Sequence, residues 1–210
     1  MIVLHHTAMR TTGAALDRLC DPGAEVSAHY LIDARGRVWQ LVEEAMRAWH
    51  AGAGQWGAVT DVNSRSIGIE LANPGDQPYS HPQMTALEDL MAGVMRRWRI
   101  APERVIGHSD MAPLRKSDPG PRFDWRRLAR QGLSVWPREG AAGAVSREDF
   151  LRDAHAFGYR LQGAVNACDL LRAFRLRFRP YASGPLVDRD CALIADLAAR
   201  FPVDRDIATA

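Results

Sequence analysis

Residues 105–121 read VIGHSDMAPLRKSDPGP, and this stretch carries the strongest structural and chemical signals in the chain. It continues a short apolar run that begins near Arg104 and is typical of a buried strand, and three prolines then favour an irregular loop. Between His108 and Asp118 the loop contains an imidazole, the amine of Lys116 and a carboxylate. A loop of this kind can bring two side chains onto one metal ion.

A third metal ligand is available at the start of the chain, where residues 2–7 read IVLHHT. Two histidines and one carboxylate, with a fourth position left for water, would form a hydrolytic zinc site. Since successive side chains on a strand face opposite ways, only one of His5 and His6 can face the metal. Asp110 and Asp118 compete as the carboxylate ligand.

Helix and strand patterns alternate along residues 1–137 and predict an α/β fold with a central sheet flanked by helices. The longest helix is expected between His81 and Ile100, where apolar residues recur at helical spacing and Pro82 suits the first turn. The other predicted elements are a strand at 2–7, a helix with a threonine cap at 12–19, a hairpin of 28–33 with 37–42, and strands at 66–71 and 104–107.

The composition changes after Trp136. Residues 138–145 read REGAAGAV, which predicts a small-residue linker, and only helical patterns follow it. Ser146 and Asp188 are expected to cap two of three helices, and residues 170–174 mark the helix between them. We therefore predict an α/β domain at 1–137, a linker at 138–145 and a small three-helix bundle at 146–206.

Bulk properties narrow the classes of function. The chain has 210 residues, is 47% hydrophobic and carries a formal charge of +2, which is too near balance to argue for a nucleic-acid partner. No apolar stretch reaches 18 residues, so no transmembrane segment is expected. The chain as given carries no secretory signal, which favours the cytoplasm; a missing leader before Met1 would instead allow a periplasmic or outer-membrane-associated protein.

The three cysteines, Cys20, Cys168 and Cys191, have no C-x-x-C spacing. Neither a disulfide framework nor a cysteine zinc site is indicated, and we expect all three to be small buried residues.

Five ordered segments between residue 2 and about residue 136 resemble the zinc-dependent N-acetylmuramoyl-L-alanine amidases, the family of AmpD and AmiD, whose fold is related to that of peptidoglycan recognition proteins. The segments are LHHT at 4–7, SAHYLI at 27–32, AWHAG at 48–52, SIGIEL at 66–71, and GHSD at 107–110 followed by DPGP at 118–121. The resemblance implies a mixed central sheet flanked by helices.

The same resemblance implies one Zn²⁺ per chain, held by His5, His108 and Asp118. It leaves His6 as a packed or supporting residue and places Asp110 outside the ligand set, where we expect it to orient a loop or a histidine. Glu70 matches the family's general base and proton shuttle, and Lys116 matches its catalytic lysine.

Local chemistry allows both catalytic assignments but by itself favours only that of Glu70. A carboxylate such as Glu70 at the end of a buried strand is unusual unless it is paired, although an ordinary salt-bridged glutamate is the alternative. A fixed ammonium at Lys116 would stabilise an oxyanion, although loop lysines commonly face solvent.

Trp49 and His50 lie in a loop of small residues, where the indole can form an apolar wall and the imidazole can hydrogen-bond to substrate. Asn63, Ala112 and Arg115 are further candidate substrate contacts by loop position alone. No catalytic role is transferred to Tyr30, because its register does not align with the tyrosine that some relatives use.

The C-terminal part resembles a helical peptidoglycan-binding module over residues 174–180 and 184–188. Four arginines alternate there with apolar residues: Arg172, Arg175, Arg177 and Arg179. We expect a solvated helix face over a core, while a nucleic-acid surface and a wall-binding groove are the alternatives.

The predicted function is hydrolysis of the amide between N-acetylmuramic acid, intact or in its 1,6-anhydro form, and the L-alanine of peptidoglycan stem peptides. Peptidoglycan fragments or polymer would be the partners, in wall recycling or remodelling. The alternatives are a non-catalytic peptidoglycan sensor on the same fold and a zinc peptidase acting within the stem peptide. The choice between anhydro-muropeptide and polymer, and the oligomeric state, stay open.

Overall fold

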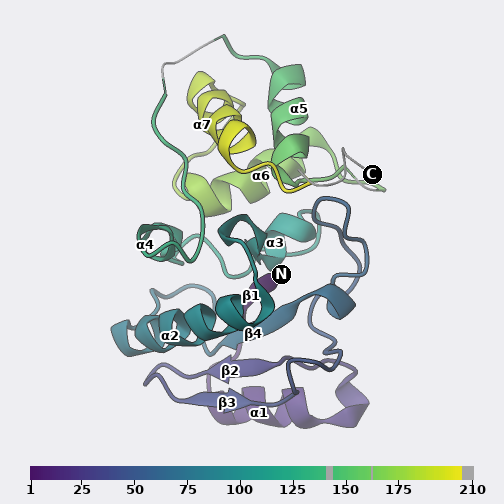
Figure 1. The fold of residues 1–210 in the computed structure, drawn as a ribbon, viewed down its shortest axis with the longest axis vertical. Coiled ribbons are helices and arrows are strands. Elements are labelled where there is room, and N and C mark those ends of the chain that lie inside the picture. The colour runs from purple at the N-terminus through teal and green to yellow at the C-terminus, as the bar shows by residue number, and fades with distance from the viewer. Residues whose placement is uncertain (141–143, 162, 205–210) are drawn as a thin grey trace.

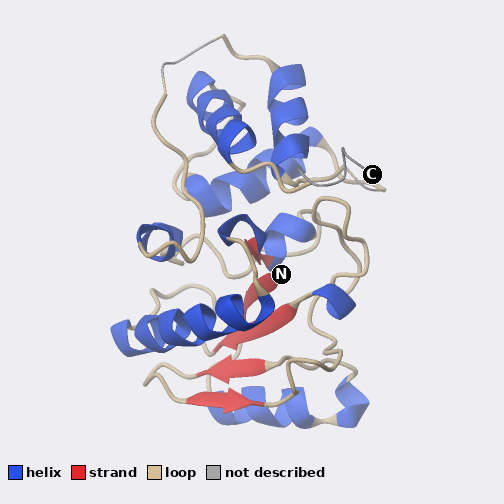
Figure 2. Ribbon diagram, in the orientation of Figure 1, coloured by secondary structure: helices blue, strands red, loops and turns tan. Residues whose placement is uncertain are grey.

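Five strands form one mixed sheet in the order β3-β2-β4-β1-β5 in a computed structural model that describes residues 1–140, 144–161 and 163–204. The strands are β1 (Ile2–His6), β2 (Tyr30–Ile32), β3 (Val38–Gln40), β4 (Ile67–Leu71) and β5 (Val105–Gly107). Four strands are parallel, and β3 pairs antiparallel with β2 at the edge of the sheet (Figure 2). The predicted α/β class with a mixed sheet is confirmed.

Seven α-helices are found in the described residues. They are α1 (Thr12–Cys20), α2 (His81–Trp98), α3 (His108–Met111), α4 (Trp125–Arg130), α5 (Arg147–Phe157), α6 (Ala167–Phe178) and α7 (Asp188–Arg200). Short 3₁₀ helices lie at Pro22–Ala24, Asn63–Arg65 and Pro102–Arg104. The sheet with α1 and α2 occupies one end of the molecule, and α5, α6 and α7 occupy the other (Figure 1).

Local signals explain most helix starts. Side chains of Thr11, Ser80 and Ser146 accept hydrogen bonds from backbone N–H groups at the starts of α1, α2 and α5. The predicted helices are confirmed, with two small corrections. The threonine that caps α1 is Thr11, and Asp188 is the first residue of α7 rather than its cap.

The predicted hairpin is present, but its strands are shorter than expected, with three residues each. The flanking residues still form hydrogen bonds, from Asp33 N to Arg37 O and from Leu41 N to His29 O. Strand ends are defined by hydrogen bonds to the partner strand, which the sequence pattern of one segment does not fix, so the predicted strands were too long.

The two faces of the sheet have different partners. Ile2 and Leu4 of β1 and Ile69 of β4 pack against α2, in a core that also contains Met84 and Leu87. Because side chains alternate along a strand, Val3, His5, Gly68 and Glu70 project to the other face. Chemistry-bearing residues therefore gather on the face that α2 leaves uncovered, at the carboxyl ends of parallel strands, where open α/β sheets commonly bind ligands.

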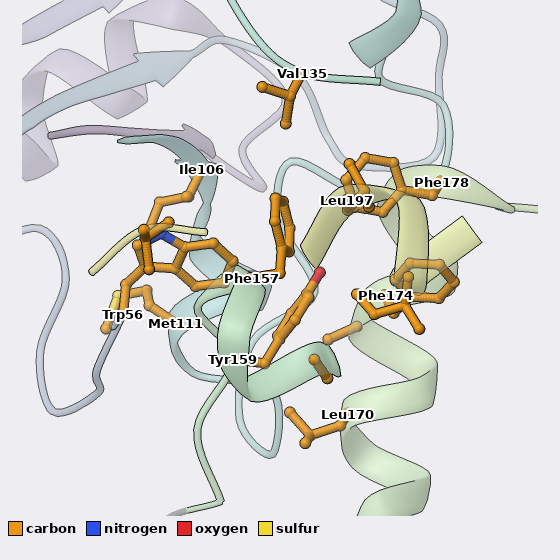
Figure 3. Packing of buried hydrophobic residues seen from close by; sticks show 14 of the residues in the cluster. Trp56, Ile106, Met111, Val135, Phe157, Tyr159, Leu170, Phe174, Phe178 and Leu197 are labelled. Carbon is orange, nitrogen blue, oxygen red and sulfur yellow. The ribbon is translucent and has the colours of Figure 1, made fainter. Parts of the chain in front are cut away.

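A second core joins the sheet to the C-terminal helices, α5, α6 and α7. Trp56, from the loop before β4, lies edge-on to Phe157 at 5.4 Å and to Tyr159 at 5.0 Å between ring centroids (Figure 3). Val3 and Ile106 of the sheet belong to the same buried cluster as residues of α5, α6 and α7. The C-terminal helices therefore pack against the sheet and against the loop that precedes β4.

The predicted boundaries at 137 and 146 stay predictions. Residues 141–143 of the predicted linker, and residues 162, 205 and 206 of the predicted bundle, lie outside the described residues. Among the described helices, none is long and apolar enough to cross a membrane.

Two expectations about side-chain burial are wrong. Cys20 and Cys168 are exposed and Cys191 is only partly buried. Arg175 and Arg177 are 6% and 2% exposed, so these two of the four arginines are not part of a solvated face, whereas Arg172 is exposed. Burial of Arg175 and Arg177 is possible because α6 is packed on two sides, where their ion-pair partners are Asp190 and Asp110 respectively.

Candidate metal centre and cleft

Three potential ligand atoms converge in the described part of the chain, from His5, His108 and Asp118. The Nδ1 atoms of His5 and His108 are 2.9 Å apart, and they lie 3.0 and 3.1 Å from Asp118 Oδ2. All three side chains are buried. His5 and His108 are the two histidines that the resemblance selected, and Asp118 rather than Asp110 is the carboxylate that meets them.

Backbone structure positions each of these side chains. His5 is near the carboxyl end of β1, and His108 begins α3 immediately after the neighbouring strand β5. The loop then returns Asp118 to the same point, where Ser109 N donates to Asp118 O at 3.0 Å. A Cβ at Gly107 would lie 2.8 Å from Pro119 Cδ, so only glycine allows this close return of the loop.

Hydrogen bonds assign the tautomer of His108. Its Nε2 lies 2.8 Å from the carbonyl oxygen of Ala51, which can only accept. Nε2 therefore carries the proton, and Nδ1 presents a lone pair to the cluster.

A longer chain of hydrogen bonds assigns the tautomer of His5. Ser66 Oγ donates to Val62 O at 2.5 Å, so its oxygen accepts from His50 Nε2 at 3.3 Å. His50 Nδ1 is then the acceptor for His5 Nε2, 3.0 Å away. His5 Nδ1, like that of His108, is left with a lone pair facing Asp118.

The position of His50 depends on a glycine in β4. The His50 ring lies over Gly68, where an added Cβ would approach the ring to 2.3 Å. Asn63 holds the backbone of the same segment, because its Oδ1 accepts from His50 N at 3.1 Å and from Ala51 N at 2.8 Å. His50 is thus built into the wall behind His5 and is 8% exposed.

Burial and neighbouring charges set the ionisation of the cluster. Burial, together with nearby His108, lowers the pKa of His5 to about 4. Burial alone would raise the pKa of Asp118, but hydrogen bonds with His108 and His5 outweigh it and hold that pKa well below its usual value. A neutral imidazole at His5 and an ionised Asp118 are therefore favoured near neutral pH.

The donor set fits a divalent metal. Two nitrogen lone pairs and a carboxylate oxygen about 3 Å apart repel one another unless a cation or a proton is shared between them. Two histidines and one aspartate also match the ligand types of a zinc site that keeps one position for water.

Glu70 lies beside this cluster because of strand register. Residue 70 of β4 is the direct partner of His5 in the parallel β1–β4 pair, so both side chains leave the same face of adjacent strands. Its Oε2 is buried without a hydrogen-bond partner. Burial, with a smaller contribution from the charge of Asp118, raises the pKa of Glu70 to about 8, while Lys116 acts in the opposite direction. The buried carboxyl is a second sign that the site is built to hold positive charge.

An open cavity of about 270 Å³ covers the cluster. Of the predicted site residues, it is lined by His5, Trp49, His50, Glu70, His108, Lys116 and Asp118. The indole of Trp49 is half exposed at this cavity. One cavity therefore collects the candidate metal ligands, the candidate base and the candidate oxyanion-stabilising lysine.

Three of the predicted substrate contacts do not line this cavity. Asn63 holds the segment at 50–51, and Ala112 N donates to His108 O at 3.0 Å. Arg115 donates to Ala51 O at 2.6 Å and also bonds Ala53 O. All three support the backbone behind the cavity, and their predicted contact with substrate stays a prediction.

Sequence patterns missed the wall formed by α1 and the segment beside it. Arg18 and Leu19 of α1, with Met9, Val26 and Ser27, line the cavity. The amphipathic pattern of α1 indicated a helix, but it gave no sign of which surface that helix covers. His6 also lines the cavity, and its Nδ1 accepts from Ala8 N at 3.1 Å.

The part of the chain that forms this cavity is similar to known proteins. Residues 1–121 match a family model, Amidase_2, described as N-acetylmuramoyl-L-alanine amidase. The N-acetylmuramoyl-L-alanine amidase AmiD of Escherichia coli is 34% identical over 225 residues, which cover 93% of this chain and 80% of AmiD. The 1,6-anhydro-N-acetylmuramyl-L-alanine amidase AmpD of Haemophilus influenzae is 42% identical over 103 residues, covering 49% of this chain and 56% of AmpD.

Solved structures extend the likeness to the C-terminal helices. A complex of E. coli AmiD with the substrate anhydro-N-acetylmuramic acid-L-Ala-D-γ-Glu-L-Lys superposes with a TM-score of 0.89 at 33% identity, covering 97% of this chain and 90% of that one. AmpDh3 of Pseudomonas aeruginosa superposes with a TM-score of 0.88 at 33% identity, covering 96% and 92% of the two chains.

Proposed function

The chain belongs to the N-acetylmuramoyl-L-alanine amidase family Amidase_2, and we propose that it holds one Zn²⁺ on His5, His108 and Asp118 to cleave peptidoglycan stem peptides from N-acetylmuramic acid. The observation that carries this proposal is the convergence of three buried ligand atoms beside the unpartnered carboxyl of Glu70. The muropeptide bound to the related AmiD supports the substrate class.

The proposed ligands are prepared by their hydrogen bonds. His5 and His108 present Nδ1 lone pairs because their Nε2 protons are donated to His50 and to Ala51 O. Asp118 adds a negative charge that strengthens cation binding. When bound, zinc would supply positive charge that polarises the scissile carbonyl and makes a neighbouring water more acidic.

We assign proton transfer to Glu70. Its carboxylate would accept a proton from the attacking water and return it to the leaving amine nitrogen of L-alanine. Nearby positive charge lowers the pKa of a carboxyl, so the loaded site would ionise a Glu70 whose pKa is raised in the metal-free protein.

Lys116 and Trp49 complete the proposed cleft. The ammonium of Lys116 would stabilise the negative charge that develops on the carbonyl oxygen as water adds. The half-exposed indole of Trp49 would form an apolar wall for the sugar or the stem peptide.

Mass spectrometry of the products tests the function. Anhydromuramyl-tripeptide and purified sacculi are each incubated with zinc-loaded protein, with chelator-treated protein, and with the Glu70→Gln variant. We expect zinc-dependent release of peptide with a free N-terminal L-alanine, and about 10²–10⁴-fold slower release by Glu70→Gln with unchanged zinc content. The matched control, Glu148→Gln, changes an exposed glutamate on α5 and should leave the rate unchanged.

The other outcomes identify the alternatives. Cleavage inside the stem peptide would indicate a peptidase, and binding without cleavage of either substrate would indicate a sensor. Full activity in Glu70→Gln with intact zinc would remove Glu70 from the mechanism. Preference between the two substrates would decide between recycling and wall remodelling.

The wall-binding role of the C-terminal helices also stays a proposal. A groove of about 520 Å³ lies there, lined mainly by apolar side chains that include Phe150, Leu171 and Leu186. Co-sedimentation with sacculi tests this role, and retained binding in Leu186→Asp would argue against the groove. The cytoplasmic location, with the periplasm as its alternative, is testable by fractionation of cells.

A further inference from the structure

A cluster of buried polar side chains lies just outside the proposed zinc site. Its members are Asp110 of α3, Tyr159 after α5 and Arg177 of α6, with exposures of 1%, 1% and 2%. Two of the three come from the C-terminal part of the chain. Figure 3 shows Tyr159 packed beside Phe157 within the shared core.

Both carboxylate oxygens of Asp110 are occupied. Tyr159 OH donates to Oδ1 at 2.6 Å, and Arg177 Nη1 donates to Oδ2 at 2.8 Å. Oδ2 also accepts from Gly107 N at 2.8 Å, which closes the first turn of α3 around His108. The carboxylate therefore connects α3 and the end of β5 to the C-terminal helices.

Arg177 makes further contacts to the same region. Its Nη2 donates to Val105 O at 2.9 Å and to Ser134 Oγ at 3.1 Å. Its guanidinium carbon lies 4.3 Å from the ring centroid of Trp125. One side chain of α6 thus bonds β5 at Val105 and α3 at Asp110, on either side of the turn that places His108.

The charges of this cluster make it a rigid support. Both oxygens of Asp110 and both terminal nitrogens of Arg177 are hydrogen-bonded, while Arg177 Nε is buried without a partner. Such a buried ion pair is costly to disrupt, because removing one partner leaves an isolated charge in an apolar interior. Burial raises the pKa of Tyr159 well above its usual value, so the phenol remains a donor to Asp110. A small displacement of α3 would have to break these bonds.

We propose that Arg177 and Tyr159 are positioning residues for the metal centre: through Asp110 they hold the His108 imidazole where it meets His5 and Asp118. The C-terminal helices would then complete the metal site in addition to any wall-binding role. This inference rests on the proposed metal site, and supporting residues behind a metal ligand typically change metal affinity by about 10–100-fold when removed.

Tyr159→Phe and Arg177→Met are compared by zinc affinity, measured by competition with a chromogenic chelator. Tyr159→Phe removes one hydroxyl and keeps the packed ring, so it should fold. We expect each change to weaken zinc binding by about 10–100-fold and to shift the visible absorption bands of the Co²⁺-loaded protein. Arg177→Lys keeps a charge and should bind zinc more tightly than Arg177→Met.

A neighbouring ion pair provides the matched control. Arg175, two residues earlier on α6, forms a buried ion pair with Asp190 at 2.5 Å and bonds to backbone at 184 and 185. Arg175→Met should lower stability but leave zinc affinity and the Co²⁺ spectrum unchanged. Equal losses of affinity in the Arg175 and Arg177 variants, or unchanged affinity in Tyr159→Phe, would overturn the positioning role. A wild-type protein that binds no zinc would instead overturn the proposed metal site.

Discussion

Glu70 has a buried carboxyl whose ionised form is unfavourable in the metal-free protein. Its Oε2 is buried without a partner, and its pKa is raised from near 4.5 to about 8 by burial and by Asp118. Carboxyls in such surroundings are typical of sites where proton transfer is needed. Because ionising Glu70 is unfavourable in the metal-free folded protein, the free energy of unfolding should depend on pH.

In chelator-treated protein, Glu70 should make stability fall as pH rises. A raised pKa in the folded state means that the folded protein binds the extra proton between about pH 4.5 and pH 8. The contribution of protonated Glu70 to the free energy of unfolding is fully present below pH 4.5 and is lost as pH rises through 8. Relative to wild type, Glu70→Gln should therefore gain on the order of 4 kcal/mol in free energy of unfolding between pH 4.5 and pH 9.

Urea denaturation at pH 5, 7 and 9 measures this difference. The two proteins share every other titrating group, so a difference that does not change with pH would contradict the raised pKa. Zinc should reduce the pH dependence, because a neighbouring cation favours the ionised carboxyl.

At the scale of elements, β4 positions the site by alternating its side chains. Ile67, Ile69 and Leu71 pack under α2, while Gly68 and Glu70 lie on the opposite face, where Glu70 lines the cavity. The parallel register with β1 puts Glu70 beside His5. Gly68 provides the space in which the ring of His50 lies.

Gly68→Ala should destabilise the protein by about 1–3 kcal/mol, because the new methyl group would overlap the His50 ring. The displaced His50 would also lose its place behind His5. Thermal and urea denaturation measure the loss. Gly13→Ala is the control, since nothing lies within 4 Å of that position in α1 and alanine favours a helix; its stability should be unchanged or up to ~1 kcal/mol higher. Similar effects from both substitutions would exclude the steric explanation.

For the whole molecule, the decisive feature is the core that joins the sheet to α5, α6 and α7. Trp56 packs on Phe157 and Tyr159, and Gly57 N donates to Gly158 O at 2.8 Å. A core shared in this way couples the unfolding of both parts.

We expect one cooperative unfolding transition for the full chain, by calorimetry and by far-UV and near-UV circular dichroism. Trp56→Ala should lower its midpoint by an amount corresponding to ~3–5 kcal/mol, because a large buried side chain leaves a cavity in the shared core. Tyr181→Ala is the control, since Tyr181 is 88% exposed. Two separate transitions in the wild-type protein would show that the two parts are stabilised independently.

Local sequence determined the helices and most of the strands, and the resemblance to a known family selected the candidate metal ligands. Helix caps and apolar spacing depend on residues within a few positions of one another, which is why α2 and α5 were predictable. The candidate metal ligands were predicted on another basis. Histidines and aspartates at or after the ends of apolar runs, in the order shared by a known family, indicate a site even when the intervening chain is not understood.

Only the tertiary structure decided which surfaces meet. His5 and Asp118 are separated by 113 positions, and the register that brings Glu70 to His5 arises from pairing between strands far apart in the chain. The same is true of Arg177, whose burial against Asp110 contradicts its basic local sequence. A local pattern records the preference of each segment for water or for an apolar interior, whereas ion-pair partners and cavity walls depend on contacts that form only when distant segments pack.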